Sequence, residues 1–208
     1  MRTLKFTKSL LLKTKIKGSG SILIIATAGL FMLLLMLSYL YRFQLMTLNR
    51  QVIDESLTSA MLGAEVVDLS RYAEDENIVL VDNTRDIFIE LIKANLGLSD
   101  NWEINRPGLT GEVKVEDFRV YNKISTSTGH YIQEIVKSTA GSYTIDHAEG
   151  EVVKVKTTDG DKVITDTSLY VKISFMVNTI GYAENTAYKN EPRYKRYALS
   201  RLVSVEIN

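Results

Sequence analysis

Cysteine is absent from the 208-residue sequence. Its absence excludes disulfide bonds, thiol nucleophiles and cysteine-based zinc sites. A folded domain in this chain must therefore be stabilised by its own apolar core. The chain is long enough for that, because domains of about 150 residues bury roughly 70% of the surface that their unfolded chains expose.

Histidine is scarce, with only His130 and His147, both in segments rich in Ser, Thr and Gly. No H-x-x-x-H or H-E-x-x-H spacing supplies further ligands, so we interpret the two as surface or loop residues. Asp159, Asp161 and Asp166 lack the twelve-residue loop and closing Glu of a calcium site, and a turn explains them better. We expect neither a metal site nor a cofactor.

The motifs of the common enzyme classes are missing too. The sequence contains no G-x-S-x-G, no P-loop and no G-x-G-x-x-G after a strand. Pairs of carboxylates always exist among 25 acidic residues, so a surface hydrolase is a hypothesis that the sequence leaves open. We nevertheless predict that the protein is not an enzyme and has no catalytic residues.

Acidic residues are absent from the first 41 positions, which carry six basic ones. The remainder holds 19 basic against 25 acidic residues, a formal net charge of −6, so the overall charge of zero combines a basic arm with an acidic body. Nucleic acid is not an expected partner, because phosphate contacts need clustered Lys and Arg. The basic positions are Arg2, Lys5, Lys8, Lys13, Lys15 and Lys17.

One long uncharged stretch runs from Gly18 to Tyr41. Its last twenty residues, from Ile22, are almost wholly apolar and as a helix would extend about 30 Å, the hydrocarbon thickness of a bilayer. Tyr39 and Tyr41 are placed where aromatic rings favour the interface, and Arg42 follows. The main alternative is a secretory signal peptide, whose shorter apolar region ends in a small-x-small cleavage site that this sequence lacks.

The basic arm orients this stretch with its N-terminus inside the cell, because basic residues are enriched in cytoplasmic flanks. We therefore predict a single-pass protein of the cell membrane with three parts. Residues 1–20 form a basic cytoplasmic leader, residues 21–41 a transmembrane helix in the lipid bilayer, and residues 42–208 an extracytoplasmic domain.

The segment Gly18-Ser19-Gly20-Ser21 is the first candidate functional site. It lies between the basic arm and the apolar stretch, which is the layout of a prepilin-type leader. Such leaders are cut after a Gly on the cytoplasmic side, which predicts cleavage after Gly18 or Gly20. A flexible Gly/Ser hinge beside the membrane is the alternative explanation.

A second candidate lies within the apolar stretch, at Ala26, Thr27, Ala28 and Gly29. Small residues of this kind let helices approach closely in lipid. The functional interpretation is packing against a neighbouring subunit or an assembly platform. Ordinary membrane-helix composition explains the same residues equally well.

Helical periodicity continues into the outer domain. Apolar residues at spacings of three and four predict one helix from about Ser21 to Leu69, with Gly63 as its weakest point. A second helix is predicted after residues 83 and 84, either of which can cap it, and Gly97 should end it. The apolar positions of the first helix are Ile53, Leu57, Ala60, Ala64 and Val67, and those of the second are Ile87, Phe88, Leu91 and Ile92.

Alternating patterns beyond Gly111 predict antiparallel strands. The first should run over 113–121 with an irregularity near Asp117 and end at Asn122. Residues 151–157 and 162–165 flank an Asp-Gly hairpin signal, and strands at 169–177 and 197–205 complete a meander. Pro107 and Pro192 should lie in connections. The expected fold class is α+β, with the outer half of the long first helix covering one face of the sheet.

This layout resembles the TadE/TadG-like pseudopilins of tight-adherence (Flp-type) pilus systems. The matching segments are KGSGSILII, MLGAEVVDL, DIFIELIKANLGL, VEDFRVYN and LYVKISFMV. The resemblance implies a pilin-like fold, processing by a prepilin peptidase, and a minor or accessory role beside other pilus subunits or an assembly platform. Filament-forming pilins carry a Glu five positions after the cut, where this chain has Leu23 or Ile25, which favours an accessory role.

A membrane-anchored extracellular binding or sensor module, unrelated to pili, is the competing hypothesis. It predicts an unprocessed leader and an outer domain that binds a ligand as a monomer.

Overall fold

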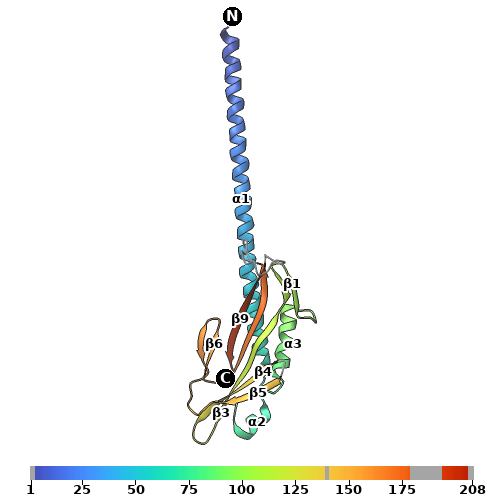
Figure 1. The fold of residues 1–208 in the computed structure, drawn as a ribbon, viewed down its shortest axis with the longest axis vertical. Coiled ribbons are helices and arrows are strands. Elements are labelled where there is room, and N and C mark those ends of the chain that lie inside the picture. The colour runs from blue at the N-terminus through green and yellow to red at the C-terminus, as the bar shows by residue number, and fades with distance from the viewer. Residues whose placement is uncertain (1–2, 139–140, 179–193, 206–208) are drawn as a thin grey trace. The chain divides into compact units, whose positions relative to one another are not determined.

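The computed structural model describes residues 3–138, 141–178 and 194–205, which contain three helices and nine strands. The chain divides into two compact units, Met1–Gln44 and Leu45–Asn208. One long helix, α1 (Thr3–Ala64), runs through the first unit and into the second (Figure 1). A long N-terminal helix followed by helices and antiparallel sheets confirms the predicted α+β class at this level.

Helix α1 ends at Ala64, five residues before the predicted end at Leu69. The chain beyond it pairs with a segment far along the sequence, because Val67 forms an antiparallel bridge with Leu80. Backbone N–H groups of Asp68 and Val81 donate to Val79 and Val66 across this bridge. These tertiary hydrogen bonds outweigh the helical periodicity that included Val67. They also define the structure of residues 78–81, for which the sequence pattern predicts neither a helix nor a strand.

Two shorter helices follow. The sequence did not predict α2 (Leu69–Asp75), although Asp68 caps it by accepting hydrogen bonds from the backbone N–H groups of Ser70 and Arg71. Helix α3 (Thr84–Leu96) confirms the second predicted helix, and Gly97 ends it in the left-handed conformation. Its predicted cap is wrong in detail. Asn83 makes no side-chain cap hydrogen bond, and the Thr84 hydroxyl donates to the Val81 carbonyl instead.

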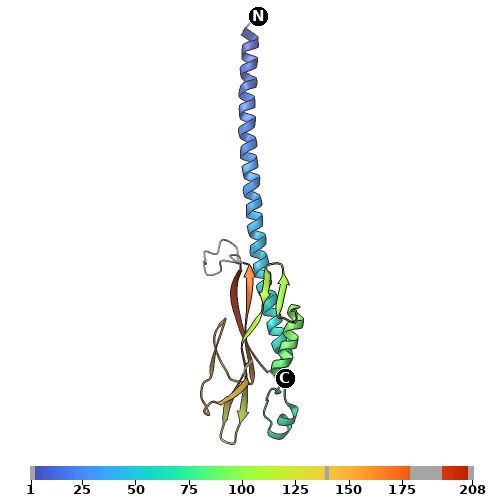
Figure 2. The same ribbon diagram turned by 45° about the vertical axis from the view of Figure 1, so that its right-hand side comes forward.

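Seven strands form one antiparallel sheet in the order β1-β2-β8-β3-β4-β5, with β9 on the other side of β8 (Figures 1 and 2). The central pair confirms the predicted strands, including the bulge between Val115 and Asp117. The strands are β1 (Glu103–Arg106), β2 (Leu109–Glu112), β3 (Lys114–Ser125), β4 (His130–Ser138), β5 (Gly141–Asp146), β8 (Ser168–Asn178) and β9 (Tyr194–Ser204).

Several strand predictions need correction. β3 does not end at Asn122, which is fully buried and accepts a hydrogen bond from the Leu80 backbone N–H at 3.2 Å. Strands β1, β2, β4 and β5 had no clear alternation and were not predicted. Pro107 does lie in a connection, the turn between β1 and β2. The predicted connection at Pro192 lies outside the described residues.

The Asp-Gly signal forms the predicted hairpin, with β6 (Lys154–Thr157) and β7 (Gly160–Val163) joined by Thr158 and Asp159. The prediction that this hairpin forms a meander with β8 and β9 is wrong, because the hairpin is a separate two-stranded sheet. Its apolar side chains pack on the main sheet rather than extending it. With neighbouring residues they form the hairpin-side core, made of Tyr121, Ile132, Val153, Val155, Ile164 and Tyr170.

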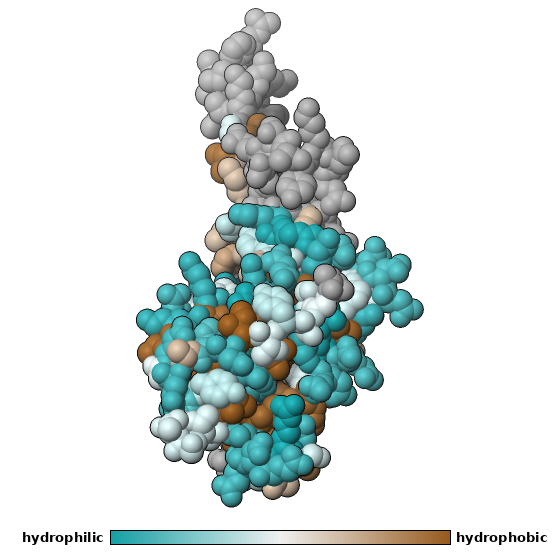
Figure 3. All heavy atoms as spheres, turned by 60° about the horizontal axis from the view of Figure 1, so that its bottom comes forward, coloured by the Kyte–Doolittle hydropathy of each residue, from teal (hydrophilic) through white to brown (hydrophobic). Residues whose placement is uncertain are grey.

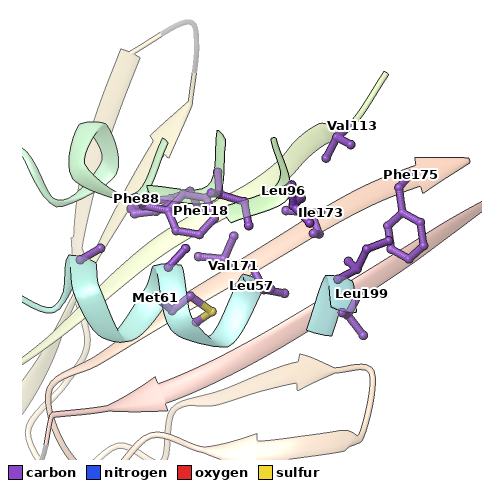
Figure 4. Close-up of a cluster of buried hydrophobic side chains, with 14 of the residues drawn as sticks. Leu57, Met61, Phe88, Leu96, Val113, Phe118, Val171, Ile173, Phe175 and Leu199 are labelled. Atoms are coloured by element: carbon purple, nitrogen blue, oxygen red, sulfur yellow. The ribbon is translucent and has the colours of Figure 1, made fainter. Parts of the chain in front are cut away.

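The opposite face of the sheet is covered by α3 and the second half of α1. Figure 4 shows Leu57 and Met61 from α1 facing Phe118, Val171 and Ile173 from the sheet. This helix-side core confirms that the outer half of the first helix covers the sheet. Its buried residues are Ile53, Leu57, Ala60, Met61, Ala64, Leu80, Phe88, Ile92, Leu96, Ile104, Leu109, Val113, Phe118, Val120, Leu169, Val171, Ile173, Phe175, Val177 and Leu199.

The turn between β1 and β2 fixes one end of this packing. Gly108 has φ +82°, and a Cβ there would lie 2.6 Å from Asn49 Nδ2. The same Asn49 amide donates to the Pro107 carbonyl at 2.8 Å. Glycine is therefore needed both for the backbone angle and for the close approach of the turn to α1.

Candidate functional site

The first candidate region is the apolar part of α1. Among the described residues, only the Gly20–Ala64 portion of this helix is long and apolar enough to cross a membrane. Its large apolar side chains between Ile22 and Leu40 are 44% to 71% exposed. Figure 3, which brings the bottom of Figure 1 forward, shows a different surface, where hydrophobic groups are interspersed with hydrophilic ones. A continuous exposed apolar surface indicates a site of contact with lipid or protein.

Both sequence-predicted motifs lie inside this helix. Residues 18–21 belong to the helix. The Thr27 hydroxyl donates back to the carbonyls of Leu23 and Ile24, both at 2.9 Å. A Cβ added at Gly29 would meet no atom within 4 Å. Ala26 and Gly29, three residues apart on one side of the helix, thus present a surface without bulky side chains, whereas Ala28 points to the other side.

The second candidate region is a polar cluster around Glu134 on β4. This carboxylate is 5% exposed and accepts from Arg119 Nη1 at 2.9 Å, while His147 Nε2 lies 3.0 Å from its other oxygen. Arg119 also donates from Nε to Asp117 at 2.9 and 3.0 Å. The hydrogen bonds to Asp117 are the main cause that raises the pKa of Arg119 above its ordinary value. The guanidinium therefore stays charged and neutralises a carboxylate that is costly to bury.

Register explains why these groups meet. Tyr121 on β3 is paired directly with Glu134 on β4, so the two side chains project on the same face of the sheet. The Tyr121 hydroxyl lies 3.4 Å from the Glu134 carboxylate, and burial is the main cause that raises the pKa of this phenol. His147 reaches the same carboxylate from the residue just after β5. The cluster thus fastens the β5–β6 connection to the sheet.

A hollow of about 400 Å³ opens beside this cluster. We call it the fork hollow, because it lies where β3 and β4 separate. It includes charged side chains of both signs and one tyrosine. Its lining consists of Arg85, Val115, Glu116, Asp117, Phe118, Arg119, Val136, Lys137, Ser138 and Tyr143.

The two histidines have different environments in the structure. As predicted, His130 is exposed, at the start of β4, and His147 lies in a loop, just after β5, but the His147 side chain is largely buried against Glu134 and also lies 3.6 Å from Glu151. Sequence reasoning missed this partner, because Glu134 occupies an inward position that an apolar pattern does not reveal. In the described part of the chain, no three His, Asp or Glu residues are grouped to hold a metal ion.

The three aspartates 159, 161 and 166 do not converge. Asp159 lies in the hairpin turn, as predicted, and pairs with Arg201. Asp166 pairs with Lys123 at 3.0 Å, and this hydrogen bond is the main cause that lowers the pKa of Asp166. Asp159 and Asp166 thus form separate ion pairs, while Asp161 lies in strand β7 rather than in a turn.

Comparison with known proteins gave no match to a family model, to a curated protein or to a solved structure. The function must therefore be argued from the geometry of these two regions.

Proposed function

We propose that this chain is a pseudopilin-like minor or accessory subunit that assists assembly of a tight-adherence type pilus at the cell membrane. The observation that carries the proposal is the dual use of α1. The same helix exposes an uncharged and largely apolar surface over residues 22–41 and supplies five residues of the helix-side core from Ile53 onward. A helix used in this way tethers a folded body to whatever surrounds its apolar half.

In this proposal the apolar half of α1 spans the lipid bilayer, with the basic arm in the cytoplasm and the sheet unit outside. Twenty apolar residues match the bilayer core, and the charge bias sets the direction. A protease added outside wall-free cells should remove a C-terminal tag. Complete protection of the tag in intact cells, with cleavage after lysis, would overturn the orientation.

Leader processing is the feature that distinguishes a pseudopilin from other anchored proteins. In cells with an active prepilin peptidase, intact-mass analysis should find a mature N-terminus at Ser19 or Ser21. Gly18→Leu and Gly20→Leu, made singly, identify the cut, because only the substitution at the cleaved position should block processing. Retention of Met1 or Arg2 in the unmodified chain would count decisively against the pilus role.

Lateral docking through the small-residue patch is the assembly step that we propose. The chain has no cysteine, so a single introduced thiol reports contacts without background. Ala26→Cys and Gly29→Cys lie on one side of α1 and should form disulfides with a neighbouring subunit in the membrane. Ile24→Cys, at similar depth on the opposite side, is the matched control. Equal crosslinking from all three positions would indicate random collision rather than docking.

The competing function is an anchored extracellular binding module, and the fork hollow is the observation that favours it. That function predicts a chain that keeps its leader and stays monomeric in the membrane. Mass analysis and crosslinking therefore decide between the two functions.

A further inference from the structure

The fork hollow lies where the sheet divides into two branches. The register between β3 and β4 stops at Arg119 and Val136. Beyond that point β4 stays paired with β5 as far as Ser138, and β3 stays paired with β8 as far as Lys114. The bulge at Val115 and Asp117 bends β3 away and increases the local twist. The space between the branches is thus built into the strand pairing rather than left by a loop.

Two of the cations that line this hollow form no ion pair with the carboxylates that line it. Arg119 is held by Asp117 and Glu134, and Glu116 is held by Lys172 at 3.0 Å. Arg85 and Lys137 lie on the wall formed by the start of α3 and the end of β4. The Lys137 ammonium donates to the Asp82 carbonyl, which is a neutral acceptor.

The surroundings of Lys137 support this description. Burial is the main cause that lowers its pKa. The carboxylates of Asp82 and Asp86, which do not line the hollow, each raise it more strongly than the nearby Arg85 guanidinium lowers it. Two like charges close together at a partly desolvated wall favour the arrival of one anionic group.

The remaining lining restricts the kind of anion. The carboxylates of Glu116 and Asp117 accept hydrogen bonds and repel a ligand with several negative charges. Tyr143, on the edge strand β5, is 58% exposed and offers a flat aromatic surface at the rim. A complementary ligand carries one carboxylate, several hydroxyl donors and a compact ring. A volume of about 400 Å³ lies in the lower part of the range for small-molecule sites.

We propose that the fork hollow binds a carboxylate-bearing sugar, a hexuronic acid unit of an acidic polysaccharide. Its carboxylate pairs with Arg85 and Lys137, its hydroxyls donate to Glu116 and Asp117, and its ring packs on Tyr143. This assignment does not depend on the pilus role, because the site belongs entirely to the sheet unit.

Full-length protein in detergent micelles tests the proposal by ligand-detected NMR titration. Glucuronate should show saturable binding, with a dissociation constant on the order of 1 mM for a single sugar unit. Glucose, which has the same ring without the carboxylate, should bind at least tenfold more weakly. Acetate and lactate, which carry the same single negative charge without the sugar ring, should also bind at least tenfold more weakly. Equal binding of glucose, or equal binding of either of these anions, overturns the sugar-acid assignment.

Variants locate the site. Arg85→Gln and Lys137→Met should each weaken glucuronate binding at least tenfold, and Tyr143→Leu should weaken it severalfold. Lys162→Gln, an exposed cation on the β6–β7 hairpin, is the matched control and should leave the affinity unchanged. Urea unfolding of each variant shows whether it is folded, and Arg85→Gln keeps the hydrogen bond between Lys137 and Asp82. Undiminished binding by folded Arg85→Gln and Lys137→Met proteins would place the sugar elsewhere and overturn the proposal.

Discussion

The two faces of the main sheet are covered by different means. Among the described residues, the helix-side core contains 20 buried apolar side chains, with the fully buried Asn122 bonded to Leu80 beside them. The hairpin-side core contains six, of which two are tyrosines whose hydroxyls lie against polar groups: Tyr170 donates to the Lys156 carbonyl at 3.1 Å, and Tyr121 lies near Glu134. The first face is stabilised by the exclusion of water from a large apolar volume. The second combines a small apolar cluster with an ion-paired carboxylate.

The two faces should therefore respond differently to substitution. A large dry core tolerates little change, because each lost methylene leaves a cavity. A small core beside buried charges depends on the geometry of a few hydrogen bonds instead. The fork hollow has Asp117 and Arg119 of these charges in its lining and also Arg85 of α3, so the candidate ligand site borders the coverings of both faces.

The largest expected effect comes from truncating the same residue type in each core. Ile92→Ala in the helix-side core should lower the free energy of unfolding by about 4 kcal/mol, and Ile164→Ala in the hairpin-side core by about 2 kcal/mol. Urea unfolding of the full chain in detergent, followed by the fluorescence of Trp102, measures both. Trp102 is the only tryptophan and packs against the helix-side core. An equal or reversed loss would break the comparison.

The second expected effect concerns the buried carboxylate. Glu134→Gln should lower the free energy of unfolding by about 2 kcal/mol, because it leaves Arg119 with one carboxylate partner and removes the nearer of the two carboxylates beside His147. Glu103→Gln, at an exposed position of β1, is the control and should change stability by less than about 0.5 kcal/mol. A double-mutant cycle with Arg119→Gln should give a clearly non-additive result. Simple additivity would mean that the ion pair contributes little.

A third and smaller effect is expected at Arg201, which connects the coverings of the two faces. Its guanidinium pairs with Asp54 of α1 through two hydrogen bonds of 2.7 Å, and also with Asp159 of the hairpin turn. Arg201→Lys loses the two-pronged geometry and should cost about 1 kcal/mol of unfolding free energy. The exposed Arg50→Lys is the matched control. A loss as large as that of Ile92→Ala would show that the two coverings form one cooperative structure.

The smallest effect is a dependence on pH at the rim of the helix-side core. Burial raises the pKa of Glu65, just after α1, from 4.5 to about 7. The folded state holds the proton more tightly than the unfolded state, so this contribution is complete below pH 4.5 and is lost as pH rises through about 7. Glu65→Gln should therefore reduce the fall in unfolding free energy between pH 5 and pH 8. Glu74→Gln on the exposed side of α2 should leave that fall unchanged, and the same slope in all three proteins would contradict the prediction.

The helix-side core was largely predictable, because its elements carry regular apolar patterns. Phe88 and Ile92 recur at helical spacing, Gly97 ends the helix, and the odd-numbered residues of β8 from Leu169 to Val177 alternate cleanly. The hairpin-side face was not predictable in the same way. In β4 the inward position after Ile132 is Glu134, which breaks the alternation, and β5 is exposed along its whole length.

The candidate site escaped sequence analysis for a related reason. Arg85 and Lys137 are far apart in the chain and have no motif in common. Only the separation of β3 from β4 brings them to one wall. Asn122 is a further example, because asparagine is depleted in strands, yet a buried hydrogen bond from the Leu80 backbone N–H holds it within β3. Local patterns reveal elements, whereas sites made by strand divergence depend on the whole pairing.

The contact between Asp54 and Arg201 also has a consequence for how the protein is made. These residues are 147 positions apart. At about 5 to 20 residues synthesised per second, the ribosome needs about 7 to 30 s to reach Arg201 after Asp54 has been added. During that time the apolar stripe of α1 has emerged while β9, which supplies Leu199 to its covering, does not yet exist. A nascent chain with such an exposed stripe is a substrate for chaperones at its site of synthesis.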